Sequence, residues 1–171
     1  MQIPTLETER LILRAPCLDD LGAYTAFCMS DRSAGVGGPF EPIDVFQKLA
    51  ALIGHWSLRG YGRWMVTDKM TQEPLGIVGP MYPPDWPEPE IAWTVFAAAE
   101  GRSVAYEAAI AARGYVYETL GWTTAISCTM ADNTRSIALA RRLGARQEEN
   151  FVHPLYGEMF VWRHPTSEAL A

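Results

Sequence analysis

Apolar and polar positions in the first third of the chain alternate at first and then recur at helical spacing. The segment 9–16 alternates and ends at a proline, which predicts a strand. The segment 18–30 carries apolar residues at helical spacing and acidic residues in its first turn, so it is expected to be a helix. A glycine-rich loop over 31–42 leads to a second predicted helix over 43–60. The buried face of this second helix is expected to comprise Ile43, Phe46, Leu49, Ala50 and Ile53.

The middle of the chain has the pattern of strands joined by turns. Two apolar runs, 63–69 and 74–82, flank the polar turn "MTQE" and predict a hairpin. The prolines of 83–89 exclude regular pairing, so this segment is expected to be a loop. The run "EIAWTVF" at 90–96 then predicts a third strand in this region.

An alanine-rich helix is predicted over 103–119, ended by Gly121. Its inward stripe is mostly small, which would let the helix lie close to a sheet. The stripe comprises Ala105, Ala108, Ala109, Ala112 and Val116. The β-branched segment 123–130 predicts a strand, and 133–144 predicts a short helix.

The segments 146–153 and 158–164 close the chain as a predicted antiparallel pair. Strands and helices therefore alternate along much of the sequence, with a hairpin in the middle and another at the end. This order predicts a single α/β domain with a mixed sheet over residues 1–171. A loose tail is expected from about residue 165.

Composition narrows the possible partners. The chain has 171 residues, and its 14 basic and 20 acidic residues give a net charge of −6, which disfavours nucleic acid as a partner. No apolar stretch is long enough to span a membrane, and the first residues lack the pattern of a signal peptide. Cys17, Cys28 and Cys128 are expected to be free thiols. These features predict a cytoplasmic protein without a metal site.

The junction between the strand at 90–96 and the following helix is the first candidate for chemistry. Its sequence is "AAAEGRSVAYEA" (97–108). A strand that leads into a helix N-terminus presents unpaired N–H groups and the positive end of the helix dipole, which together favour an anion. Gly101 allows unusual backbone angles and Arg102 adds positive charge. An ordinary turn containing a glycine is the alternative interpretation.

Two further segments carry candidate residues. Asn133 and Ser136 lie at a predicted helix start with Arg141 nearby, where the simpler interpretation is a helix cap beside a solvated basic face. The run "YPPDWPEPEIAW" gathers Asp85, Trp86, Glu88, Glu90 and Trp93, and carboxylates with aromatic faces suit a cationic amine. A solvated proline-rich loop anchored by one tryptophan is the alternative. The three histidines lack metal-ligand spacing and are expected to be structural or exposed.

Several of these segments, taken in order, resemble the GNAT superfamily of acetyltransferases, and most closely its branch related to ribosomal-protein N-terminal acetyltransferases. The resemblance covers about residues 6–164 and rests most on "ETERLILR" and on "NTRSIALARRLGA". It implies a mostly antiparallel mixed sheet of about seven strands, with a splayed central pair and about four helices. It also implies transfer of an acetyl group from acetyl-CoA to an amine.

The resemblance assigns cofactor contacts residue by residue. The splayed strand that receives the acetyl-pantetheine arm matches Trp93, Thr94, Val95 and Phe96. The pyrophosphate loop matches Gly101, Arg102, Ser103, Val104 and Ala105. Asn133 matches an asparagine that contacts the pantetheine, and Ser136 matches a serine close to the thioester. Arg141 is expected to support the cofactor.

The chain departs from the family pattern at three positions. Glu100 places a negative charge, and Ser103 a side chain, where the family loop usually carries glutamine or arginine and glycine. Many relatives carry a tyrosine that protonates the leaving thiolate, and its position is matched here by Ala140. These departures predict a working but weakened phosphate cradle, with the acid role left to Ser136 or to water.

Direct attack of the acceptor amine on the thioester is the expected mechanism. Glu90 is predicted to be the base, with the alternative that it only orients the amine. Asp85, Trp86, Glu88 and Glu90 are predicted to bind this amine, a small molecule or a peptide. Two rivals remain: a CoA-binding or regulatory module that has lost catalysis, and an interaction protein on the same fold. The tryptophan content and the apolar last strand leave room for a homodimer.

Overall fold

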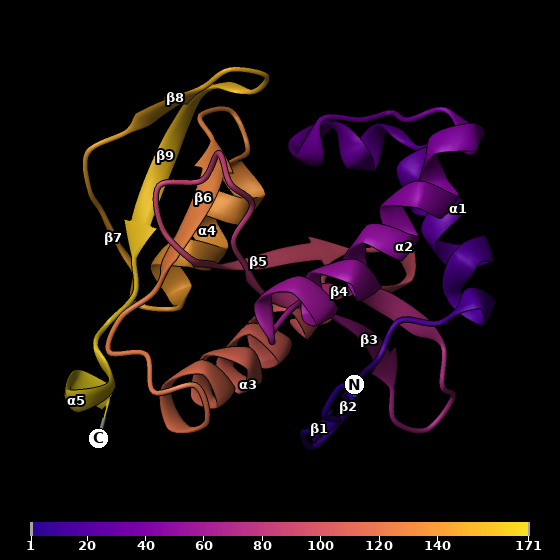
Figure 1. Ribbon diagram of the computed structural model, residues 1–171, viewed down its shortest axis with the longest axis horizontal. Coiled ribbons are helices and arrows are strands. Elements are labelled where there is room, and N and C mark those ends of the chain that lie inside the picture. Colours follow the sequence, from indigo (N-terminus) through magenta and orange to yellow (C-terminus); the bar gives the residue numbers. More distant parts are fainter. Residues whose placement is uncertain (1, 171) are drawn as a thin grey trace.

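In the computed structural model, which describes residues 2–170, one mixed sheet carries helices on both of its faces (Figure 1). The helices are α1 (Leu21–Cys28), α2 (Pro42–Arg59), α3 (Val104–Glu118), α4 (Thr134–Arg142) and α5 (Ser167–Leu170), with 3-10 turns η1 (Leu18–Asp20), η2 (Asp31–Val36) and η3 (Ala97–Ala99). The strands are β1 (Leu6–Glu7), β2 (Leu11–Arg14), β3 (Trp64–Asp68), β4 (Pro74–Met81), β5 (Glu90–Val95), β6 (Ile126–Met130), β7 (Arg146–Gln147), β8 (Phe151–His153) and β9 (Gly157–Arg163).

The sheet has nine strands in the order β1-β2-β3-β4-β5-β6-β9-β7, with β8 also paired to β9. All neighbours are antiparallel except β5 and β6, which run parallel. The strand count exceeds the predicted seven because β1 adds a short edge strand and because 146–153 forms two strands rather than one. The four predicted helices are present, and the expected loose tail contains the short helix α5.

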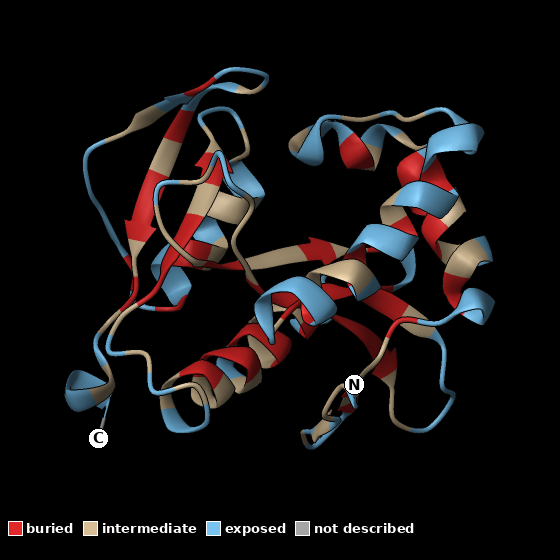
Figure 2. Cartoon of the chain, viewed as in Figure 1, coloured by how far each residue is buried: buried red, intermediate tan, exposed pale blue. Residues whose placement is uncertain are grey.

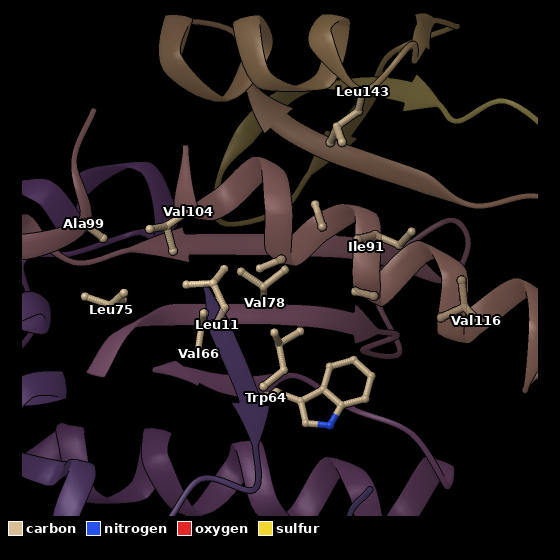
Figure 3. Close-up of a cluster of buried hydrophobic side chains, with 14 of the residues drawn as sticks. Leu11, Trp64, Val66, Leu75, Val78, Ile91, Ala99, Val104, Val116 and Leu143 are labelled. Carbon is tan, nitrogen blue, oxygen red and sulfur yellow. The ribbon is translucent and has the colours of Figure 1, made fainter. Parts of the chain in front are cut away.

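The main hydrophobic core lies between α3 and the sheet (Figure 3). Ala108, Ala109 and Ala112 are fully buried there, so the predicted small stripe does bring α3 against β4 and β5. Val104 and Val116 mark the two ends of the packed face of the helix. A second cluster packs α1 and α2 on the other side, as the buried faces in Figure 2 indicate.

The buried face predicted for helix α2 from the sequence is wrong. Ile43, Phe46 and Ala50 are exposed and Ile53 is 38% exposed, whereas the buried positions are Val45, Leu49, Leu52 and Trp56. Both stripes have helical spacing, so periodicity alone does not separate them. Trp56 decides the orientation, because its ring packs against Trp64 at 5.0 Å and its indole N–H donates to the Arg63 carbonyl at 3.1 Å.

Candidate active site

Strands β5 and β6 separate almost as soon as they meet. Within residues 2–170, Glu90 and Ile126 are the only paired residues between these two strands, and Figure 1 shows β6 and β9 diverging from β5. Ser127, the next residue on β6, bridges the two strands at this point, because its hydroxyl donates to the Ile91 carbonyl at 2.6 Å. The ring Nε2 of His164 lies 2.8 Å from the same hydroxyl. A buried side-chain bond therefore replaces the backbone ladder where the strands part.

The split leaves one edge of β5 open. Successive residues of a strand point their backbone groups to opposite edges. The Phe96 amide donates to Leu75 of β4, whereas the Ile91 carbonyl faces β6. Trp93 and Val95 therefore present their backbone groups to the opening, as predicted. Thr94 does so only through its side chain, whereas Phe96 packs its ring into the second core cluster and does not line the cavity.

A cavity of about 800 Å³ occupies the opening and runs from the start of α3 to Glu90. It is lined by many of the predicted residues from separate parts of the chain. These are Trp86, Glu90, Trp93, Thr94, Val95, Gly101, Ser103, Val104, Ala105, Asn133 and Ser136. One continuous cavity thus joins the predicted phosphate loop to the predicted base.

The loop before α3 is built to present backbone N–H groups. Gly101 and Ser103 both take left-handed backbone angles, at φ +72° and +58°. The first amide bonded back along the helix is that of Glu107, to the Ser103 carbonyl at 3.1 Å, so the amides of the first turn have no helical partner. A Cβ on Gly101 would meet open space. The cavity therefore reaches a helix start whose unpartnered amides favour an anion.

Charged side chains around this loop are already paired. Glu100 forms ion pairs with Arg32 and with Arg135, the latter at 2.8 Å, so its charge is balanced at the cavity rim. Arg102 instead pairs with Asp68 at 2.9 Å and does not line the cavity. The positive charge of the Arg102 side chain is therefore directed away from the cavity, and only its backbone is available to a ligand there.

Helix α4 contributes a different arginine from the predicted one. The Arg141 guanidinium lies over the Trp162 ring at 5.4 Å and does not line the cavity. Arg142 does line it, donating to the Ser103 hydroxyl at 3.0 Å and lying over Tyr106. The helical spacing from Ser136 through Leu139 places Arg142 on the same face, and this signal in the sequence would have identified it.

Asn133 and Ser136 are positioned by each other. The Asn133 side chain accepts from the Ser136 amide at 3.1 Å and so caps α4, as the simpler interpretation held. Ser136 Oγ accepts from the Trp93 indole at 3.2 Å, which leaves the hydroxyl proton free to be donated elsewhere. Ala140 is fully buried beside Trp162 and does not line the cavity.

Glu90 lies at the deep end of the cavity and is only 3% exposed. Burial raises the pKa of its carboxyl to about 7, although the Cys128 amide, 2.8 Å away, and the charge of Arg63 act in the opposite direction. A carboxyl with this pKa exchanges protons near neutral pH, as a general base requires.

The predicted amine-binding run is only partly at the cavity. Trp86 and Glu90 line it, but Asp85 and Glu88 do not. Asp85 bonds to His153 Nε2 at 2.8 Å, and Glu88 forms a two-bond ion pair with Arg163 at 2.7 Å. Both carboxylates thus tie the proline-rich loop to β8 and β9 and lie outside the cavity in which they were expected to bind the amine.

Sequence reasoning missed the cavity wall contributed by the first half of the chain. Tyr24, His55, Arg63 and Tyr156 all line it near Glu90. The charged Arg63 beside the apolar run "WMV" was the one visible signal. The others come from helix α1, helix α2 and the hairpin turn before β9, and only the tertiary fold brings them to β5.

Among residues 2–170, no group of three or more His, Cys, Asp or Glu side chains is arranged to hold a metal ion. Within the same described part of the chain, no helix is both long and apolar enough to cross a bilayer. The three cysteines are free thiols, as expected. Strand β9 pairs with β6 on one side and with β7 and β8 on the other, so neither edge is open for pairing with a second copy.

Comparison with known proteins decides the family. A family model described as an acetyltransferase (GNAT) domain matches residues 10–146. The chain belongs to the GNAT acetyltransferase family. As a member of that family it is an enzyme that acetylates amino groups.

Solved structures support the same assignment. This GNAT protein is 35% identical to an acetyltransferase from Agrobacterium tumefaciens str. C58, with a TM-score of 0.87, covering 96% of this chain and 95% of that one. It shares its fold with RimL, a ribosomal L7/L12 alpha-N-protein acetyltransferase also solved in complex with coenzyme A. The apo RimL structure is 13% identical, with a TM-score of 0.77, and the match covers 95% and 94% of the two chains. A ribosomal-protein-S5-alanine acetyltransferase from Vibrio fischeri has the fold as well, at 14% identity, a TM-score of 0.71 and coverage of 98% and 99%.

Proposed function

We propose that this protein binds acetyl-CoA in the cavity between β5 and β6 and transfers the acetyl group directly to a primary amine. The observation that carries the proposal is one cavity that joins the α3 N-terminus, the open edge of β5 and the buried carboxyl of Glu90. The residues fit the ligand: first-turn amides and Arg142 for the phosphates, and the backbone of Trp93 and Val95 for the extended arm.

Acetyl-CoA, when bound, supplies an activated acetyl thioester. Glu90 takes a proton from the acceptor ammonium, directly or through a water, and frees the nitrogen lone pair. The nitrogen bonds to the acetyl carbon while the carbon–sulfur bond breaks. The nitrogen gives up its second proton as the amide forms, and a proton passes to the departing sulfur through water, so that CoA is released as the thiol. The Val95 amide stabilises charge that develops on the acetyl oxygen. Ser136 donates its free hydroxyl proton in a hydrogen bond to the departing sulfur.

Release of free CoA thiol in the presence of an amine panel tests this function. The panel comprises amino acids, peptides with free N-termini, polyamines and an aminoglycoside, and mass spectrometry identifies the acetylated product. We expect transfer to at least one amine. Binding of acetyl-CoA without any transfer would instead support the regulatory module that has lost catalysis, and absence of binding would support an interaction protein on the same fold.

A further inference from the structure

Arg63 places a positive charge in the part of the cavity that holds Glu90. It directly precedes β3, whose first residue, Trp64, packs into the core beneath α3. Successive residues of a strand face opposite sides, so the Arg63 side chain points to the other side, where it lines the cavity. Its charge there acts on Tyr24, Tyr156 and Glu90.

The Arg63 guanidinium has no counter-ion of its own. Across residues 2–170, the structure records neither an ion pair nor a side-chain hydrogen bond for it, and Glu90 is not within ion-pair distance. Of the other arginines that line the cavity, Arg32 and Arg135 pair with Glu100, whereas Arg142 donates to Ser103 at the phosphate end. Burial lowers the pKa of Arg63, which shows that its charge is poorly solvated.

The neighbouring basic groups do not compete for an anion at this place. His55 Nδ1 lies 2.7 Å from the Tyr61 carbonyl and its Nε2 accepts from the Tyr82 amide at 3.0 Å, so the ring is a neutral tautomer with both nitrogens engaged. Burial lowers its pKa further. The Lys48 ammonium lies over the Phe40 ring at 3.7 Å. Arg63 is thus a cation left available at the acceptor end of the cavity.

The walls around these two charges are aromatic. Trp86, Tyr24 and Tyr156 line the cavity beside Arg63 and Glu90. Trp86 also contacts His153 edge-on at 4.9 Å, and Tyr156 stacks on the same ring at 4.5 Å. Since His153 is fixed by Asp85, both aromatic side chains are held in place. The acceptor end therefore has a cationic corner, a carboxyl that takes protons, and rigid apolar walls.

We propose that the acceptor is a small amine that also carries a carboxylate, in the manner of an aromatic amino acid, with its carboxylate held by Arg63 and its amine presented to Glu90. This inference rests on the proposed acetyl transfer and adds the class of substrate to it. Arginine and a carboxylate form two parallel hydrogen bonds, and a pair of this kind in a shielded site is strong. An amine without an anionic group leaves Arg63 without a counter-ion.

Matched amines test the proposal, because they share one aromatic skeleton and differ in the group on the carbon that bears the amine. Since that group also changes the basicity of the amine, the decisive comparison is the acid-to-amide ratio in wild type against that in Arg63→Gln. Phenylalanine, phenylalaninamide and phenethylamine are compared for kcat/KM with saturating acetyl-CoA and for calorimetric binding to the CoA-saturated protein. We expect phenylalanine to be preferred over the other two by at least about tenfold in both measurements. The calorimetric binding measurement tests the role of Arg63 even if turnover is slow.

Variants then assign the preference to Arg63. Arg63→Gln is expected to abolish the preference for the acid over the amide, and Arg63→Lys to keep part of it. Arg59→Gln, the same change at an exposed position outside the cavity, should leave the preference intact. The ratio of acid to amide is the decisive readout, since a change in the pKa of Glu90 or in stability affects both substrates equally.

The outcomes separate this inference from the proposed function. Acetylation of amines with no preference for a carboxylate, or a preference that survives in Arg63→Gln, would overturn the role of Arg63 and leave acetyl transfer standing. Failure of acetyl-CoA to bind would remove the proposed function itself. Equal binding of phenylalanine and its amide to the CoA-saturated protein would overturn the inference even without turnover.

Discussion

At the scale of single residues, the site depends on two buried or partly buried charges that the fold keeps apart. Glu90 has its pKa raised by burial on a strand whose neighbour has diverged, and Arg63 lacks a counter-ion on the same side of the sheet. Glu100 shows the opposite arrangement, since two arginines balance its charge at the cavity rim. The acceptor end of the cavity therefore holds a proton-accepting carboxyl and a cation that are not paired with each other.

The pH dependence of kcat/KM in wild type and in Glu90→Gln tests whether Glu90 is the base. Wild-type kcat/KM should rise with pH and level off above about pH 7, because the carboxyl must be ionised to accept a proton. The variant should lose about 100-fold or more at pH 7.5 and lose this pH dependence. Steady-state rates from pH 5.5 to 8.5 provide the test. Unchanged turnover in the variant would leave Glu90 with an orienting role only.

The same substitution should raise the stability of the fold at high pH. The native state holds the Glu90 proton up to about pH 7, whereas an unfolded glutamate releases it near pH 4.5, so this group costs stability as pH rises between these values. At pH 8 this group lowers the free energy of unfolding by about 3 kcal/mol. Denaturant titrations should therefore show that Glu90→Gln is more stable than wild type at pH 8 and similar at pH 4. Glu118→Gln, at an exposed position, serves as the control.

At the scale of elements, a network of buried side chains bridges the point where β5 and β6 separate. Ser127 joins β5, β6 and His164, the residue after β9, in one buried chain of hydrogen bonds. Arg113 of α3 extends this chain to the Leu143 carbonyl, which lies 2.7 Å from its guanidinium. Burial and the nearby arginines lower the pKa of His164 to about 3, so its ring is neutral and serves as a fixed structural link. The opening in the sheet is thus bridged by polar groups that would otherwise lack partners.

Ser127→Ala should destabilise the fold, because it leaves the Ile91 carbonyl and the Nε2 of His164 each without a buried partner. We expect a loss of about 1–3 kcal/mol in the free energy of unfolding. Urea titration measures it, with the exposed Ser57→Ala expected to stay within about 0.5 kcal/mol of wild type. A Ser127→Ala variant as stable as wild type would mean that the opening does not depend on this bond.

A second prediction at this scale concerns the loop before α3 and its affinity for CoA. Glu100→Gln frees Arg32 and Arg135, which both line the cavity, to pair with a bound anion. We expect the Kd for CoA to fall about threefold or more at low salt and the gain to shrink as salt is added. Calorimetry at two salt concentrations measures this. Weaker binding in the variant would mean instead that Glu100 positions the two arginines.

At the scale of the whole molecule, the cavity exists because distant segments meet at the split in the sheet. Local signals in the sequence identified the β5–α3 junction, the capped start of α4 and the position of Glu90, since each depends on a few neighbouring residues. Arg142 was missed although its helical spacing from Ser136 was a usable signal. Arg63 and the Ser127–His164 bond could not be predicted, because they depend on which face a strand turns inward and on which segments the fold brings together. Helix α2 shows the same limit, with two apolar stripes of equal spacing and one tryptophan that selects between them.

The binding of acetyl-CoA at the α3 N-terminus is tested most directly by calorimetric titration of wild type, Ser103→Asp and Ser103→Asn. Both variants keep a residue that caps helices and tolerates left-handed angles, so both should fold. The aspartate adds a negative charge where the pyrophosphate is proposed to lie, and should raise the Kd at least about tenfold, whereas the neutral asparagine should stay within about threefold of wild type. Equal affinity in all three proteins would contradict a phosphate site at this loop.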